Sequence, residues 1–155
     1  MKAGRIRTLR GQIDHVSGEL KRRLIIDDGR PNSGLKILEF HVWAGVNTQQ
    51  AFGSFGLALD VVPAAGAEDI FDAGDNRQIA WATWGYADAG TYFVQLPQFT
   101  LVDPDHIVNR DLFFYGLASH HPVKWNYLIV CQEYELTDDE AIITIVKETS
   151  QNTTQ

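Results

Sequence analysis

The chain has 155 residues, of which 45% are hydrophobic, and carries a formal net charge of −7. This length is typical of one domain with a substantial core, and the absence of any run of about 18 apolar residues excludes a membrane-spanning helix. Residues 1–5 lack the apolar stretch of a signal peptide, so we expect a protein made in the cytoplasm and not secreted. The single cysteine, Cys131, excludes an intramolecular disulfide and is expected to be a small buried side chain.

The charge is divided unevenly along the chain. Residues 1–24 carry seven basic and two acidic side chains, a net of +5, whereas residues 25–155 carry a net of −12. This segment is either a leading strand with ordinary surface charge or an arm that contacts nucleic acid or an acidic neighbouring subunit. The candidate contact residues are Lys2, Arg5, Arg7, Arg10, Lys21, Arg22 and Arg23.

The elements begin with the basic segment. Residues 4–10 alternate loosely and predict an extended arm or a charged edge strand, and residues 12–16 are ambiguous. Residues 21–26 predict a short strand, and the run of Asp, Gly, Pro, Asn and Ser at residues 27–34 predicts a turn or loop.

Two strands are predicted in the next part of the chain. In residues 35–43, strict alternation places Leu38, Phe40 and Val42 on one face. After a loop at residues 44–53, residues 55–62 form a strand whose inner face carries Leu57, Leu59 and Val61. Pro63 ends that strand, and an acidic loop with at most a short turn follows at residues 64–76.

Several shorter strands follow. Residues 103–105 form a turn with Pro104 at a favoured position, and residues 87–90 and 116–123 are also predicted as turns or loops. The strands between them are predicted at residues 78–86, 91–95, 99–102 and 107–115.

Residues 125–136 predict one long strand, because they are rich in aromatic and β-branched residues and contain no Gly or Pro. Since residues 127–131 are apolar on both faces, we expect a central strand that is covered on both sides. The expected core residues of this strand are Tyr127, Leu128, Ile129 and Val130.

A C-terminal helix is predicted directly after this strand. The run from Thr137 to Glu140 is a capping box, in which the threonine hydroxyl and the glutamate carboxylate satisfy the first free amides of a helix. Ile142, Ile143, Ile145 and Val146 give residues 141–150 a broad apolar face that we expect to pack on the sandwich or on a neighbour.

The fold class that follows is all-β, an antiparallel β-sandwich with one C-terminal α-helix. The loops at residues 44–53 and 63–76 are long enough to cross between sheets, which favours a jelly-roll-like or Greek-key topology over a meander. We expect one domain, in which residues 1–24 are the basic arm and leading strand, residues 25–136 the sandwich body and residues 137–150 the helix.

The sequence contains no catalytic pattern. A Gly-x-Ser-x-Gly motif and a glycine-rich phosphate loop are absent, and the five histidines lack metal-ligand spacing. Glu133 and Glu135 project from one strand face and either flank a sugar or form a solvated strand end. We therefore expect no enzyme activity, no cofactor and no metal site.

Three segments of the chain carry a resemblance to a known family: Val102-Asp103-Pro104-Asp105-His106-Ile107-Val108, Asp111-Leu112-Phe113-Phe114-Tyr115, and Asn126-Tyr127-Leu128-Ile129-Val130 running into Glu133-Tyr134-Glu135-Leu136. They resemble single jelly-roll structural proteins of tailless icosahedral viruses, including phages. The resemblance implies a capsid, minor capsid or decoration subunit of the virion. It would act by contacts with copies of itself or other virion proteins, and weakly with packaged nucleic acid. The alternative is a carbohydrate-binding β-sandwich module, receptor-binding or accessory, with aromatic residues exposed on one sheet face.

Overall fold

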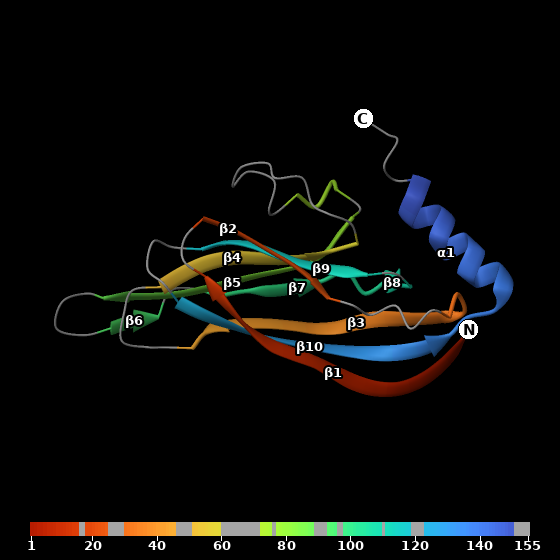
Figure 1. Cartoon of the computed structure of the whole chain (residues 1–155), viewed down its shortest axis with the longest axis horizontal. Helices are drawn as coiled ribbons and strands as arrows, with labels where there is room; N and C mark the ends of the chain where they lie inside the picture. The colour runs from red at the N-terminus through yellow and green to blue at the C-terminus, as the bar shows by residue number, and fades with distance from the viewer. Residues whose placement is uncertain are drawn as a thin grey trace.

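Two antiparallel sheets lie face to face, and one helix stands at the end of the sandwich (Figure 1). This computed structural model describes residues 1–15, 18–24, 30–45, 51–59, 72–75, 77–88, 93–95, 98–109, 111–118 and 123–150. The elements are β1 (Lys2–His15), β2 (Gly18–Leu24), β3 (Ser33–Ala44), β4 (Ala51–Ala58), β5 (Gln78–Asp88), β6 (Phe93–Gln95), β7 (Thr100–Val102), β8 (Ile107–Val108), β9 (Leu112–Ala118), β10 (Val123–Glu135) and α1 (Asp138–Ser150).

The strand pairing is that of one long antiparallel hairpin rolled into two layers. β1 pairs with β10, β2 with β9, β3 with β8 and β4 with β5, so the pairs are nested around the β4–β5 connection. The strand order is β1-β10-β3-β8 in sheet A and β2-β9-β4-β5 in sheet B, where β6 and β7 both pair with the far side of β5. This nested order is a jelly roll, and the predicted all-β sandwich is confirmed.

Aromatic side chains join the two sheets in the core. Phe114 of sheet B lies 5.9 Å from Phe40 and 5.3 Å from Tyr127, both of sheet A, measured between ring centroids. Phe55 of sheet B lies 5.7 Å from Phe114 and 4.7 Å from Trp125 of sheet A. These contacts span the gap between the inner faces, so the core is one continuous cluster.

Strand β10 lies inside sheet A, between β1 and β3, as a central strand should. Tyr127 and Ile129 face the core, as predicted, together with the buried Cys131. The prediction for Leu128 and Val130 is wrong, because these side chains alternate to the outer face and are only partly buried. Nothing in the described part of the chain covers that second face, so it is open despite its apolar residues.

The face predicted for Leu38 is also wrong. Ile37 lies opposite Cys131 and Glu39 opposite Val130, so Leu38 is an extra residue in a β-bulge. The bulge shifts the alternation by one residue, which lets Ile37 before it and Phe40 after it both face the core. Leu38 itself is exposed on the outer face of sheet A.

Residues 107–115 do not form the single strand that was predicted. They contain β8, which pairs with β3 in sheet A, and β9, which pairs with β2 and β4 in sheet B. The chain changes from one sheet to the other between Val108 and Leu112, and the apolar pattern continues from β8 into β9 because both strands contribute to one core.

Several predicted boundaries shift. β1 includes the ambiguous residues 12–15, β4 begins at Ala51 inside the predicted loop, and β9 extends to Ala118. Val61, most of the acidic loop at residues 64–76, and the tail after Ser150 lie outside the described residues.

Candidate interaction surfaces

The first 24 residues supply one edge strand to each sheet. β1 pairs with β10 along most of its length, and β2 pairs with β9. The Arg22 side chain reaches from β2 to β1 and donates a hydrogen bond of 3.2 Å to the carbonyl of Gln12, which closes this side of the sandwich. The basic residues therefore lie on paired strands.

Four of the seven basic residues have partners within the chain. Besides Arg22, Arg23 binds Asp111 and the pair Arg5 and Arg7 binds one carboxylate. Lys2, Arg10 and Lys21 are exposed and form no ion pair with any described residue. These three are the basic side chains best placed to meet a partner.

Glu133 accepts hydrogen bonds from two arginines of β1. Its carboxylate lies 3.1 Å from Nε of Arg5 and 3.0 Å from Nη1 of Arg7. Partial desolvation acts to raise the pKa of Glu133, but the hydrogen bonds from Arg7 and Arg5 outweigh it and hold the pKa below its usual value. The carboxylate is thus committed to the arginines, which does not suit it to act as a general acid.

A polar surface pocket of about 570 Å³ adjoins this cluster at the end of sheet A. Its lining includes Arg5, Arg7, Arg30, Glu133 and Tyr134. The pocket lies where the inner face of sheet A continues beyond the apolar core. Its arginines and carboxylates largely balance in charge, so the pocket has no strong preference for an anion or a cation.

Helix α1 begins with two reciprocal hydrogen bonds. The amide of Thr137 donates to Oε2 of Glu140 over 2.9 Å, and the amide of Glu140 donates to Oγ1 of Thr137 over 3.3 Å. This is the geometry of a capping box. The backbone hydrogen bond from Thr137, and after it the amino group of Met1 at 2.9 Å, lower the pKa of Glu140 to about 2.

The first turn of α1 is held against the sandwich. Ala141 is buried, and Nδ2 of Asn32 donates a 2.6 Å hydrogen bond to Oδ1 of Asp138. Ile142 is 59% exposed and Ile143 54% exposed, so the expected packing of these side chains on the sandwich is wrong, and the alternative of packing on a neighbour stays a prediction. In Figure 1, α1 stands beside the end of the sandwich and does not lie across the face of either sheet. We call Ile142, Ile143 and Val146 the α1 stripe.

The outer face of sheet A carries a second exposed apolar surface. Ile6 is 62% exposed, Leu38 and Trp43 are also exposed, and Leu128 and Val130 of β10 lie between them, partly exposed. We call these five residues the sheet A patch. They lie on three adjacent strands, where Thr8, Arg10, Glu39 and His41 are the residues directly opposite Leu128 and Val130, so apolar and polar side chains alternate across the patch.

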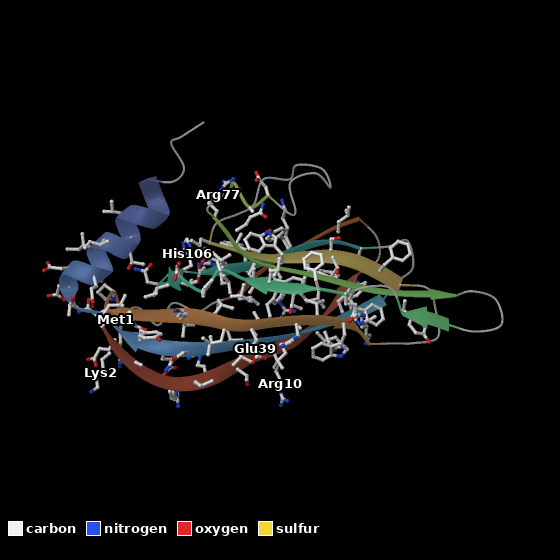
Figure 2. All side chains as sticks on the ribbon, turned by 180° about the vertical axis from the view of Figure 1, so that it is seen from behind. Met1, Lys2, Arg10, Glu39, Arg77 and His106 are labelled. Carbon is white, nitrogen blue, oxygen red and sulfur yellow. The ribbon has the colours of Figure 1, made fainter. Side chains whose placement is uncertain are left out.

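Charged side chains border the sheet A patch. Arg10 of β1 lies opposite Leu128, and Lys36 of β3 lies opposite Gln132. Glu39 lies 2.9 Å from Nε2 of His41 on the same strand. Figure 2 shows Arg10 and Glu39 projecting from the outer face of sheet A, away from the other sheet.

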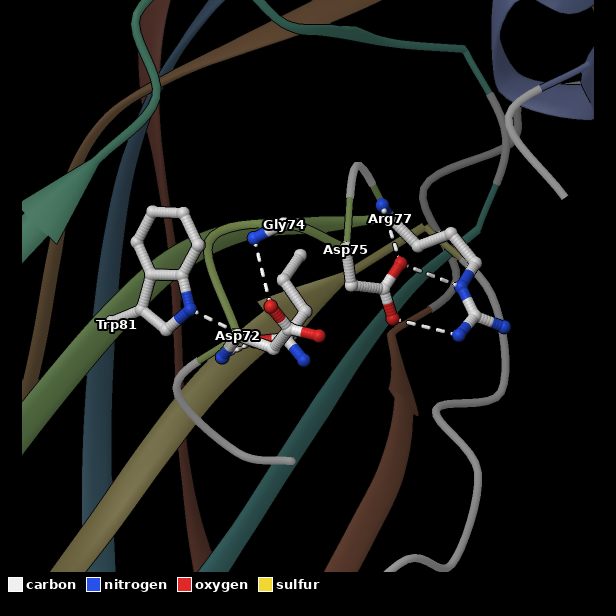
Figure 3. Close-up of polar contacts among 6 residues, drawn as sticks. Asp72, Gly74, Asp75, Arg77 and Trp81 are labelled. Atoms are coloured by element: carbon white, nitrogen blue, oxygen red, sulfur yellow. Dashed lines mark hydrogen bonds and ion pairs between the residues drawn. The ribbon is translucent and has the colours of Figure 1, made fainter. Parts of the chain in front are cut away.

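The outer face of sheet B is covered in part by the chain itself. Oε1 of the buried Gln78 accepts hydrogen bonds from Nε1 of Trp81 at 2.9 Å and from the amide of Asp72 at 3.2 Å (Figure 3). These bonds fix the turn at residues 72–75 next to the sheet. Gln78 therefore has a structural role.

A bidentate ion pair stabilises the same turn. Asp75 accepts from Nε and Nη2 of Arg77 at 2.8 and 2.7 Å, and these bonds lower the pKa of its carboxyl group (Figure 3). Tyr115 of β9 is buried nearby, and its burial, together with the charges of Asp75 and Asp72, raises the pKa of its hydroxyl group. Sheet B is thus partly covered by residues of its own chain, in contrast to sheet A.

The described residues do not assemble a catalytic or metal-binding group. In that part of the chain, no cluster of three or more His, Cys, Asp or Glu side chains has the arrangement of a metal site. His106 lies 3.5 Å from a carboxylate oxygen of Asp103, while His120 and His121 lie outside the described residues. None of the helices described in the structure has the length and apolar character needed to cross a membrane.

Comparison with known proteins gives no relative for this chain. No protein-family model matches it, and neither a curated protein nor a solved structure does. The jelly roll and the two exposed apolar surfaces are therefore the features of the molecule that bear on its function.

Proposed function

We propose that this chain is a structural subunit of a virus particle, a capsid, minor capsid or decoration protein that acts by subunit contacts. The observation that carries the proposal is the pair of exposed apolar surfaces, the α1 stripe and the sheet A patch. Full burial of an isoleucine side chain contributes roughly 1.5–3 kcal/mol, so covering Ile142 and Ile143 would contribute about 1–2 kcal/mol each. Exposed apolar surfaces of this kind mark sites of contact with another protein, which a structural subunit requires.

The jelly roll supports this proposal without deciding it. Jelly rolls form viral capsid proteins, lectins and cupins, so the fold alone leaves three functions to separate. A cupin holds a metal with histidines of its sheets, and the described residues offer no such cluster. A lectin gathers its exposed aromatic residues on one sheet face.

The exposed aromatic residues favour the subunit over the carbohydrate-binding module. Among the described residues, Trp43 is exposed on sheet A, Phe52 on sheet B and Phe99 just before β7. Phe52 and Phe99 lie on sheet B and Trp43 on sheet A, so the three rings are divided between the two sheets and do not form one stacking platform. Trp43 belongs to the sheet A patch, where a protein contact would cover it.

The proposal is tested by measuring assembly of the purified chain. Size-exclusion chromatography with light scattering, from low to high protein concentration, should show a rise from monomer to a defined oligomer, and negative-stain microscopy should show closed particles or regular arrays. The control is a glycan array, on which we expect no binding. A chain that stays monomeric throughout and binds a glycan through Trp43 would overturn the proposal in favour of the carbohydrate-binding module.

Deletion of residues 2–10 is a poor test of the basic segment, because it removes most of the strand that pairs with β10. The substitutions Lys2→Ala, Arg10→Ala and Lys21→Ala leave the pairing intact and remove the basic side chains that have no ion pair among the described residues. If packaged nucleic acid is a partner, the triple variant should bind single-stranded DNA more weakly and with a smaller salt dependence. Equal binding of both proteins would exclude these residues as the contact.

A further inference from the structure

We propose that the α1 stripe of one copy packs on the sheet A patch of a second copy, in a head-to-tail contact. This inference rests on the proposed function, because it names the partner and the two surfaces through which the subunit would assemble. Its partner is another copy of this chain, which presents both halves of the contact.

The positions of the two surfaces require a contact between molecules. The start of α1 is fixed at the end of the sandwich by the burial of Ala141 and the hydrogen bond from Asn32 to Asp138. The sheet A patch lies on the outer face of the sandwich, where Arg10 and Glu39 project away from sheet B (Figure 2). One copy therefore presents the two surfaces in different directions and cannot cover one with the other.

The apolar side chains of the two surfaces suit each other. Ile142 and Ile143 follow Asp139 by three and four residues, so Asp139 lies on the same side of α1 as the stripe. The sheet A patch presents five apolar side chains across three strands, on which a helix with an apolar face can pack.

The charges at the two surfaces are complementary. The first turn of α1 is acidic, and Asp139 forms no ion pair or hydrogen bond with any described residue. Arg10 and Lys36 flank the sheet A patch on β1 and β3, and likewise form no ion pair with described residues. Glu39, the acidic residue at the patch, has His41 as its partner. A helix whose stripe covers the patch would place its acidic turn within reach of a basic side chain.

A contact between two different surfaces is heterologous, so it does not close after two subunits. Each copy that binds through its helix still offers its own patch to the next. Repetition gives a ring if the rotation closes and a longer array if it does not, which is the behaviour that a shell subunit needs.

The test uses two variants, each lacking one surface. In the helix variant, Ile142→Gln and Ile143→Gln remove two of the three apolar side chains of the α1 stripe while keeping good helix formers. In the patch variant, Ile6→Thr and Leu38→Thr remove exposed apolar side chains while keeping a residue type favoured in strands. The control is Leu101→Thr, an exposed leucine of β7 on sheet B. Circular dichroism and urea melts confirm that all three variants are folded.

Light scattering then separates the possible contacts. We expect wild type and the Leu101→Thr control to assemble alike, each surface variant alone to be monomeric, and a mixture of the two variants to form a 1:1 dimer that grows no further. The dimer forms because the patch variant keeps its helix and the helix variant keeps its patch. A patch variant that self-associates like wild type would indicate a helix-to-helix contact, and a helix variant that does so would indicate a sheet-to-sheet contact. Either outcome overturns the inference.

Failure of the inference is distinguishable from failure of the proposed function. If wild type assembles and both surface variants assemble equally well, the subunit role stands and the head-to-tail contact is wrong. If wild type remains monomeric at every concentration, the subunit role and the contact are both wrong.

A charge reversal tests the electrostatic part separately. Asp139→Lys should weaken assembly at least severalfold at low salt, and adding Arg10→Glu and Lys36→Glu to the same chain should restore it. Assembly that is unchanged by Asp139→Lys, or is not restored by the reversal, would overturn the proposed docking of the acidic turn against these two residues.

Discussion

Replacing Phe114 by alanine tests the assignment of the core most directly. The ring is fully buried on the inner face of sheet B and contacts Phe40 and Tyr127 of sheet A and Phe55 of its own sheet, with ring centroids 5.3 to 5.9 Å apart. It therefore connects both layers, and its removal leaves a cavity that neither sheet can close alone.

The expected decrease in the free energy of unfolding follows from this packing. A buried Phe→Ala substitution destabilises a protein by about 3–5 kcal/mol, and the three aromatic contacts place Phe114 near the upper end of that range. Total stabilities are roughly 5–15 kcal/mol, so the substitution removes a large part of the stability of the fold. With a urea m-value of about 2 kcal/mol/M, the midpoint of unfolding should fall by about 1.5–2.5 M.

The assay is urea denaturation followed by tryptophan fluorescence. Trp125 reports on the core because its ring lies 4.7 Å from that of Phe55. The matched control is Phe113→Ala, which removes the same ring from the neighbouring residue on the outer face of β9, where it lies opposite Arg23. We expect the control substitution to lower the free energy of unfolding by about 1 kcal/mol, because the Phe113 side chain is only partly buried. Equal losses for the two variants would mean that the faces of β9 are assigned wrongly.

Three further predictions use the C-terminal third of the chain. Ile129→Ala should lose about 2–5 kcal/mol in a denaturant melt, whereas Val130→Ala should lose about 1 kcal/mol or less, and a reversed order would contradict the faces of β10. Thr137→Ala should lower helix stability by about 1 kcal/mol, seen as faster hydrogen exchange of α1 amides, while Thr137→Ser keeps the hydroxyl and should behave like wild type. The pKa of Glu140 is lowered from its ordinary 4.5 to about 2 on folding, so its contribution is complete above pH 4.5 and is lost as the pH falls toward 2. The difference in urea midpoint between wild type and Glu140→Gln should therefore shrink between pH 5 and about pH 2.5, and a constant difference would exclude this linkage.

The sequence by itself determined the features that depend on neighbouring residues. Period-two alternation and turn residues indicated the strands and the sandwich, and the spacing of Thr137 and Glu140 indicated where α1 begins. These signals are local, because a turn, a cap or a strand face is decided within a few residues. The jelly roll that the long loops favoured is borne out by the nested pairing of the strands, although only the loop at residues 44–53 joins strands of different sheets, since β4 and β5 pair within sheet B.

The tertiary structure decided which surfaces are covered. Leu128 and Val130 look like core residues from their chemistry, yet only Tyr127 and Ile129 have a second sheet to pack against. The bulge at Leu38 and the crossing between β8 and β9 depend on register with partners far along the chain, which alternation within one segment does not encode. For the same reason, the apolar residues of α1 indicated a buried face, and only the position of the helix at the end of the sandwich left Ile142 and Ile143 exposed, since burial depends on the partners that the rest of the fold brings within reach.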